Sequence, residues 1–211
     1  MAEQPATDER GEFMQAIAAR HPPFRHAVLE DLRVSAIHRG ERSQFRSGLD
    51  AALQAIRLAW VSDAFAAQVL YRLKARLQAR GVPLLPRLAH RLAMALAQLT
   101  IGDPAIVAPG VYVVHGQVIV DGLVEIGPGV VLSPFVTIGL RAGTVLGPTI
   151  EAGATIGTGA KVIGPVTVGA GARVGANAVV VDDVPPGATV VGIPARVVAG
   201  GAATGEASAS G

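Results

Sequence analysis

The sequence predicts an α+β fold, in which an N-terminal α-helical segment is followed by a parallel β-helix of hexapeptide repeats. Three observations predict it. Val, Ile or Leu returns at nearly every sixth position of the second half. Glycine occurs 4 times in residues 1–98 but 18 times in residues 99–198. Apolar residues of the first half instead follow the spacing of amphipathic helices.

The change in composition near residue 100 divides the chain into segments. We expect residues 1–27 to be poorly ordered, because Pro22-Pro23 interrupts any early helix. Residues 28–99 are expected to form the helical segment and residues 100–198 the β-helix. The tail, residues 199–211, consists mainly of Gly, Ala and Ser without apolar anchors, so we expect it to be disordered.

Capping residues mark the helices of the first half. Ser47 and Ser62 suit N-cap positions, Gly81 suits the position after a helix end, and Pro86 suits a first turn. The apolar stripes of the three helices are Leu49/Leu53/Ile56, Phe65/Val69/Leu73/Leu77 and Leu88/Leu92/Leu96. These stripes carry no chemistry, and we interpret His90 among them as a surface or interhelical residue.

The helical half is basic, with 14 Lys/Arg against 9 Asp/Glu in residues 1–98. The six cations from Arg72 to Arg91 have no acid between them, as in an arm that binds nucleic acid. Arg72, Arg76 and Arg80 also recur every fourth residue, off the apolar stripe, which is typical of the solvated side of a helix. We favour the solvated side and expect no nucleic-acid partner.

The repeat is the strongest signal in the sequence. In each hexamer, alternate residues of a short strand point inward and a turn follows, so three strands close one coil of 18 residues. Residues 114–185 would supply four coils, and a loop is expected near Thr144, where the pattern fails. The inward positions, taken every sixth residue, are Val114, Val120, Ile126, Leu132, Ile138, Thr144, Ile150, Ile156, Val162, Val168, Val174 and Val180.

Composition excludes several classes of protein. Cysteine is absent, which excludes disulfide scaffolds, thiolate metal sites and a cysteine nucleophile. The longest apolar run, Leu92–Ala97, is far shorter than the roughly 20 residues of a membrane span, and the acidic N-terminus is unlike a signal peptide. The column of inward aliphatic residues explains the mean hydropathy of +0.45 without a membrane. We therefore expect a cytoplasmic protein with no membrane partner.

Several motifs resemble the serine O-acetyltransferases and related short polysaccharide acetyltransferases, over roughly residues 50–198. The motifs that carry the resemblance, in chain order, are Ala67–Arg72, Ile101–Ala105, Val114–Gly122, Val184–Gly187 and Gly192–Arg196. The resemblance implies a left-handed β-helix, an exception to the usual right-handed crossover. It also implies an acyltransferase that uses acetyl-CoA, assembled as a homotrimer or a dimer of trimers.

His115 is the candidate catalytic residue. It is the only histidine after residue 90, and its place at a corner of the coil points it outward. It aligns with the histidine that acts as general base in the resembling enzymes, and imidazole titrates near neutral pH. The resemblance implies that it takes a proton from an acceptor hydroxyl or amine, which attacks the thioester. A backbone N–H near Gly139 is the candidate oxyanion donor.

The resemblance also implies which residues bind coenzyme A. Gly157, Thr158 and Ala176 would line the pantetheine arm in a groove between subunits, and Arg173 and Arg196 would meet the nucleotide phosphates. Repeat geometry alone also explains each small residue, and a solvated corner explains Arg173. A metal is not expected, because the repeat half has a single histidine.

Departures from the family bear on the acceptor. The segment 139–149 is shorter than in serine acetyltransferases and has Leu146-Gly147 where the family has Arg-His. Val114 replaces an acid before the catalytic histidine, and Thr100-Ile101-Gly102 replaces Asp-Ile-His. Arg141 is then the remaining candidate for an anionic substrate group. We expect an acceptor other than serine, such as a sugar or another small metabolite. Serine O-acetylation in cysteine biosynthesis and a non-catalytic trimeric repeat protein are the alternatives.

Overall fold

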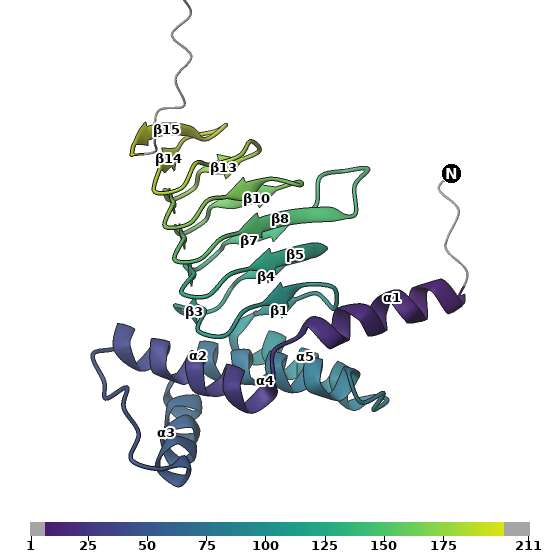
Figure 1. The fold of residues 1–211 in the computed structure, drawn as a ribbon. Coiled ribbons are helices and arrows are strands. Elements are labelled where there is room, and N and C mark those ends of the chain that lie inside the picture. Colours follow the sequence, from purple (N-terminus) through teal and green to yellow (C-terminus); the bar gives the residue numbers. More distant parts are fainter. Residues whose placement is uncertain (1–6, 201–211) are drawn as a thin grey trace, which may run out of the picture.

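The computed structural model describes residues 7–200 and consists of five helices beneath a tapering stack of short strands (Figure 1). The helices are α1 (Thr7–Arg20), α2 (Phe24–His38), α3 (Gly48–Val61), α4 (Asp63–Gln78) and α5 (Leu85–Ala97). The strands are β1 (Thr100–Ile101), β2 (Ile106–Val107), β3 (Tyr112–Val113), β4 (Ile119–Val120), β5 (Leu123–Ile126), β6 (Val131–Leu132), β7 (Thr137–Gly139), β8 (Leu146–Ile150), β9 (Thr155–Ile156), β10 (Lys161–Ile163), β11 (Thr167–Val168), β12 (Arg173–Val174), β13 (Val179–Val180), β14 (Thr189–Val191) and β15 (Arg196–Ala199). The predicted fold class, a helical segment followed by a parallel β-helix, is confirmed.

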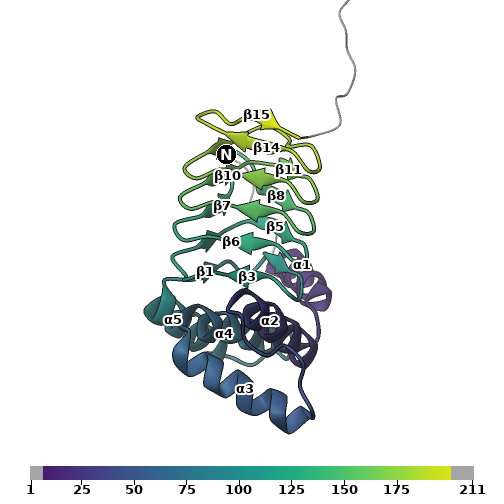
Figure 2. The ribbon, with the colours of Figure 1, turned by 90° about the vertical axis from the view of Figure 1, so that its left-hand side faces the viewer.

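The strands form the three faces of a prism (Figure 2). Sheet A has the order β1-β4-β7-β10-β13, sheet B has β11-β8-β5-β2, and sheet C has β15-β14-β12-β9-β6-β3. All pairings are parallel except β14 with β15, which closes the far end. Paired residues along sheet A lie 19, 18, 24 and 18 positions apart, so an 18-residue coil is interrupted by a small and a larger insertion. The larger one is the loop between β7 and β8, which contains Thr144 as expected.

The inward column follows the predicted period with two differences. It begins with Leu99 and Ile101, so the first coil precedes the predicted start at residue 114. At the corner after β3, Val113 is buried and Val114 is only partly buried, because the turn to β4 contains one extra residue. From Val118 the column of buried aliphatic and alanine side chains continues through Val190, interrupted by the β7–β8 loop. This continuous core keeps each outer corner in a fixed position.

The helices begin and end close to the predicted positions. The Ser47 hydroxyl accepts a hydrogen bond from Asp50 N, and the Ser62 hydroxyl accepts one from Phe65 N. Pro86 lies in the first turn of α5, and Gly81 has a φ of +65° after α4. Local chain chemistry therefore sets these boundaries, as predicted.

The prediction that Arg72 lies on a solvated side is wrong. Its side chain is 3% exposed and joins the helices to the β-helix. Nε and Nη2 donate to the Asp31 carboxylate of α2 at 2.9 and 3.1 Å, and Nη1 and Nη2 donate to Val107 O and Ala108 O at 2.6 and 2.8 Å. Burial raises the pKa of Asp31, and the charge and hydrogen bonds of Arg72 oppose that rise. Helical spacing places Arg72 off the apolar stripe of α4, but it does not reveal the carbonyls of Val107 and Ala108 that this face meets.

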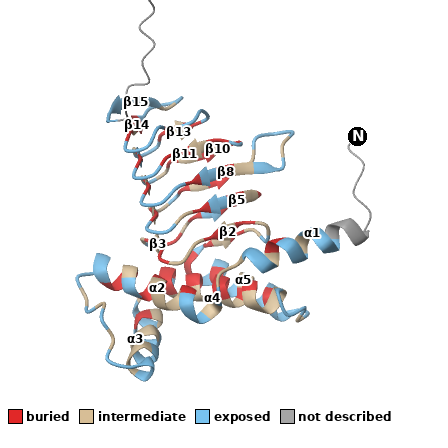
Figure 3. Cartoon of the chain, viewed as in Figure 1, coloured by how far each residue is buried: buried red, intermediate tan, exposed pale blue. Residues whose placement is uncertain are grey.

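The large aliphatic stripes of α3 and α5 lie on the outside of the chain (Figure 3). Leu88, Leu92 and Leu96 of α5 are exposed, while alanines of the same helix are buried. On α3, Leu49, Leu53, Ile56 and Trp60 are exposed, and Trp60 is 89% exposed. Alanine lets α5 approach α4 closely, and the larger side chains are left on the outside.

Residues 7–27 are more ordered than predicted, and residues 1–6 of the same segment lie outside the described residues. Residues 7–20 form α1, and Pro22-Pro23 separates α1 from α2 instead of preventing helix formation. Ile17 is buried, and Arg20 Nη2 contacts Glu125 Oε1 of β5 at 2.7 Å. The predicted disordered tail lies outside the described residues from residue 201, and β15 extends to Ala199. Among residues 7–200, no helix combines the length and apolar character needed to cross a membrane.

Candidate active site

The turns that lead from sheet C to sheet A lie above one another along one edge of the prism. These turns, residues 114–118, 133–136, 157–160 and 175–178, define what we term the His115 edge. Backbone hydrogen bonds link successive turns, from Gly159 N to Pro134 O at 2.9 Å and from Asn177 N to Thr158 O at 2.8 Å. The edge is therefore a continuous row of turns, with His115 at the end nearest the helices.

His115 is exposed, and the residues after it attach its turn to the end of α5. Gln117 N donates to Ala97 O at 2.7 Å. Gly116 has a φ of +100°, and a Cβ there would lie 2.2 Å from Ala97 O. Glycine is needed at this point because its φ is left-handed and because the helix end occupies the space of a side chain. The junction of the two halves thus holds the imidazole at the surface.

Two cavities lie on the sheet A side of this turn. One, of about 320 Å³, is lined by Gln98, Thr100, Gln117, Ile119, Phe135, Val136, Thr137 and Lys161. The other, of about 830 Å³, lies between α5 and the first coil and shares Thr100 and Ile119 with the first. His115 lines neither cavity, although Gln117 of the same turn lines the smaller one. The smaller cavity is therefore the one to which the turn of the candidate base contributes a residue.

The larger cavity carries most of the local charge. Lys74 is buried and donates to Ile101 O at 2.6 Å and to Asp103 Oδ1 at 2.9 Å. Burial lowers the pKa of Lys74, although Asp103 opposes this effect. Burial alone would raise the pKa of Asp103, but the charge of Lys74 and hydrogen bonds lower it overall. Burial, assisted by Lys74, also lowers the pKa of His90, which lines this cavity.

The structure brings three of the predicted coenzyme residues to the His115 edge. Gly157 and Thr158 lie in the turn two coils above His115, and Ala176 lies three coils above it. Because paired strands are about 4.8 Å apart, these turns lie roughly 10 and 14 Å along the edge from the His115 turn. A Cβ on Gly157 would lie 2.7 Å from Val174 O, so coil packing alone requires glycine there.

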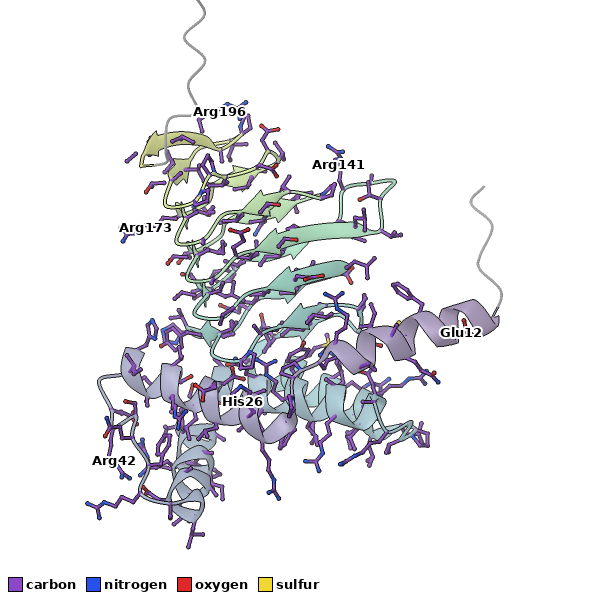
Figure 4. All side chains as sticks on the ribbon, in the orientation of Figure 1. Glu12, His26, Arg42, Arg141, Arg173 and Arg196 are labelled. Atoms are coloured by element: carbon purple, nitrogen blue, oxygen red, sulfur yellow. The ribbon has the colours of Figure 1, made fainter. Side chains whose placement is uncertain are left out.

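Other predicted residues lie elsewhere within the chain. Gly139 ends β7, and Arg141 lies in the loop that follows, at the corner between sheets A and B. Arg173 is exposed on β12 of sheet C, and Figure 4 shows it on the opposite side of the prism from Arg141. Arg196 of β15 pairs with Asp182 at 3.2 Å, with both side chains mostly exposed. Within one chain, Gly139 and Arg141 therefore lie at a different corner of the prism from His115.

Several residues of the two cavities were not predicted. The repeat pattern locates the turns, but it does not show that α5 covers the first coil or that Lys74 and Asp103 meet there. The one sequence signal for the smaller cavity was Phe135, a bulky residue at a turn position where glycine is expected. In residues 7–200, His, Asp and Glu form no group of three or more that could hold a metal ion.

Comparison with known proteins supports the repeat and the fold. Residues 147–182 match the family model described as bacterial transferase hexapeptide (six repeats). No curated protein matches the sequence at a significant level. Three similar solved structures are serine acetyltransferases.

The structure of the Brucella abortus strain S19 enzyme in complex with coenzyme A has a TM-score of 0.72 and 22% identity, and the match covers 95% of this chain and 85% of that one. A serine acetyltransferase complex with CoA has a TM-score of 0.68 and 26% identity, over 89% and 74% of the two chains. The Neisseria gonorrhoeae enzyme in complex with serine has a TM-score of 0.67 and 24% identity, over 88% and 73%. The chain therefore contains hexapeptide repeats and has the fold seen in these enzymes.

Proposed function

We propose that this hexapeptide-repeat chain, with the fold of the serine acetyltransferases, transfers an acetyl group from acetyl-CoA to a hydroxyl or amine of a small acceptor. One observation carries the proposal. His115 is exposed at the end of an edge whose two farther turns contain small residues, and its turn contributes Gln117 to a cavity with polar and apolar lining. The likeness to two structures that contain coenzyme A supports the same donor here.

In the proposed reaction, the imidazole of His115 accepts the proton of the acceptor hydroxyl or amine. The acceptor oxygen or nitrogen attacks the thioester carbonyl carbon, and the carbonyl oxygen becomes an oxyanion. Collapse of the tetrahedral intermediate breaks the carbon–sulfur bond and releases the coenzyme thiolate. The imidazolium then returns its proton to the sulfur, so His115 ends the cycle neutral. Exposure of the ring on a rigid turn lets it reach a bound substrate.

The residues present fit coenzyme A along the His115 edge. The turns at Gly157, Thr158 and Ala176 leave room for an extended pantetheine arm, whose thiol end would point toward His115. Arg173 is available for the phosphates. Arg196 would exchange its contact with Asp182 for a phosphate, and such an exposed ion pair adds little stability.

A complete site would need a second copy of the chain. Gly139 and Arg141 lie at a different corner from His115, so they could act on the same substrate only from a neighbouring subunit. We therefore propose a homotrimer in which this corner faces the neighbour's His115 edge. The exposed apolar side chains of α3 and α5 would support a dimer of trimers through the helices.

The β7–β8 loop bears on two classes of acceptor. The shortened loop between β7 and β8 contains no histidine, and Arg141 is its one charged residue. A zwitterionic amino acid would therefore find few paired charges there, which favours a sugar or another small metabolite. Serine is the second candidate, supported by the likeness to the structure that contains serine. A cytoplasmic location fits a reaction that consumes acetyl-CoA.

The test is release of free thiol from acetyl-CoA with serine, amino sugars and neutral sugars as separate acceptors. We expect release with at least one acceptor and a loss of about 100-fold or more in kcat in His115→Ala. His26→Ala is the matched control, because His26 is exposed on α2, away from the edge. Coenzyme A binding without turnover on any acceptor would instead indicate a non-catalytic repeat protein.

A further inference from the structure

Phe135 occupies a backbone conformation that suits other residues better. Its φ is +63°, in the left-handed region. The equivalent positions of the other turns on the His115 edge are Gln117, Gly159 and Asn177, with φ values of +56°, +74° and +56°. Glycine and asparagine tolerate this region, whereas a bulky side chain there is strained. The turn therefore favours a residue other than the one it has.

Packing within the chain does not explain Phe135. The side chain is 55% exposed, so little apolar burial offsets the backbone strain. Its turn is nevertheless well held, because Lys161 Nζ donates to Phe135 O at 2.7 Å and Gly159 N donates to Pro134 O at 2.9 Å. A strained, exposed aromatic ring on a rigid turn is a feature of ligand sites more than of cores.

The location of Phe135 connects it to the chemistry. Its turn lies one coil above the His115 turn, about 4.8 Å further along the edge, and one coil below the turn of Gly157. Phe135 also lines the cavity of about 320 Å³, to which the His115 turn contributes Gln117. The Phe135 turn therefore lies between the turn of the proposed base and the proposed path of the coenzyme arm, which is where the proposed reaction places the acceptor.

Besides Phe135, the cavity is lined by the apolar residues Ile119 and Val136 and by five polar residues. Gln98, Gln117, Thr100 and Thr137 contribute amides and hydroxyls, and Lys161 contributes an ammonium group. An apolar ring beside many hydrogen-bonding groups suits a molecule with one apolar face and several hydroxyls. A pyranose sugar has such a face in its ring C–H groups. Serine has no comparable apolar face.

We propose that Phe135 determines acceptor specificity by serving as the platform on which a pyranose acceptor lies, with one hydroxyl or amine presented to His115. This inference rests on the proposed function, since it names the substrate class of the same site. Phe135 would contact the substrate and fix its orientation without exchanging a proton.

Replacement by glycine separates this role from a structural one. Phe135→Gly relieves the backbone strain, so we expect its urea midpoint to stay equal to or rise above that of the wild type. We expect kcat/KM for the sugar acceptor to fall by about tenfold, while KM for acetyl-CoA stays within about twofold. Phe135→Tyr should restore most of the acceptor kcat/KM. Leu84→Gly removes another exposed apolar side chain with a left-handed φ (+65°), just before α5 and outside the His115 edge, so it is the control and should leave this kcat/KM unchanged.

Calorimetry with N-acetylglucosamine, in the presence of coenzyme A, gives an independent readout. We expect the affinity of Phe135→Gly to be about tenfold weaker than that of the wild type. If the wild type binds this sugar but transfers no acetyl group to it, the proposed acetyltransferase function is wrong, whereas the role of Phe135 in sugar binding is retained. The proposal would be overturned if Phe135→Gly left sugar binding and kcat/KM unchanged. It would also be overturned if the variant dissociated the oligomer while the activity of the site stayed unchanged.

Discussion

The buried Arg72 at the junction of the two halves allows a quantitative prediction. Its guanidinium donates four hydrogen bonds, two to Asp31 and two to backbone carbonyls of the first coil. In Arg72→Met, the carboxylate of Asp31, which is 1% exposed, loses its cationic partner and keeps only backbone hydrogen bonds such as that from Gly110 N. Breaking a buried ion pair in this way costs about 3–5 kcal/mol. Each of the two carbonyls left without its donor adds about 1 kcal/mol, for a total of about 5–7 kcal/mol.

The assay is urea unfolding followed by far-ultraviolet circular dichroism, with linear extrapolation to zero denaturant. The double variant Arg72→Met/Asp31→Asn removes the buried charge but keeps an oxygen to accept the hydrogen bond from Gly110 N. It should be about 2 kcal/mol more stable than Arg72→Met. Arg33→Met breaks an exposed pair with Glu30 and should cost under about 1 kcal/mol. If Arg72→Met costs no more than Arg33→Met, the described role of the junction is wrong.

Two further predictions concern the junction. Burial, together with the charges of Arg72 and Lys74, lowers the pKa of His21 from 6.5 to about 4. The unfolded chain therefore binds this proton more tightly, so the unfolding free energy should fall as the pH falls from 6.5 toward 4. Allowing for partial exposure of the ring, the unfolding free energy at pH 5 should be about 1 kcal/mol lower than at neutral pH. Chemical denaturation of His21→Asn over the same pH range should not show this decrease. Gly116→Ala should strain the turn by about 1–3 kcal/mol and lower acetyl transfer, because a Cβ would lie 2.2 Å from Ala97 O. Gly40, after α2, also has a left-handed φ but has no atoms within 4 Å of an added Cβ, so equal activity losses in Gly40→Ala and Gly116→Ala would contradict the anchoring of His115 by α5.

The β-helix could be predicted from the sequence because one rule repeats along it. A strand of two or three residues shows its inward side chain at a fixed interval, so Val120, Ile138 and Val162 identify the column directly. A departure of one residue, such as the extra residue between Val113 and Val120, is too small to detect in the period. The predicted start at Val114 was therefore one residue late at that corner.

The helical half was harder to predict because its packing reverses the usual pattern. Ala89 and Ala93 are buried while Leu88 and Leu92 are exposed, so hydrophobicity alone identifies the wrong face. The burial of Arg72 depends on carbonyls of Val107 and Ala108, which are 35 and 36 residues away. No local spacing encodes such a contact.

The candidate site was predicted in part. The outward position of His115 follows from the coil period, and the structure places it at an exposed turn. The adjacent cavity depends on how α5 meets the first coil, and Phe135 and Lys161 enter it from later coils. Residues from four successive coils and a helix end form one surface, and this arrangement appears only when the coils are stacked.

The most direct measurement of the central claim is a crystal structure of the assembled protein with coenzyme A. We expect the pantetheine arm to lie along the turns at Gly157, Thr158 and Ala176, with the sulfur atom beside the imidazole of His115 and a second subunit covering both. Coenzyme A bound along another edge, or His115 open to solvent with no second subunit near it, would contradict the proposed mechanism.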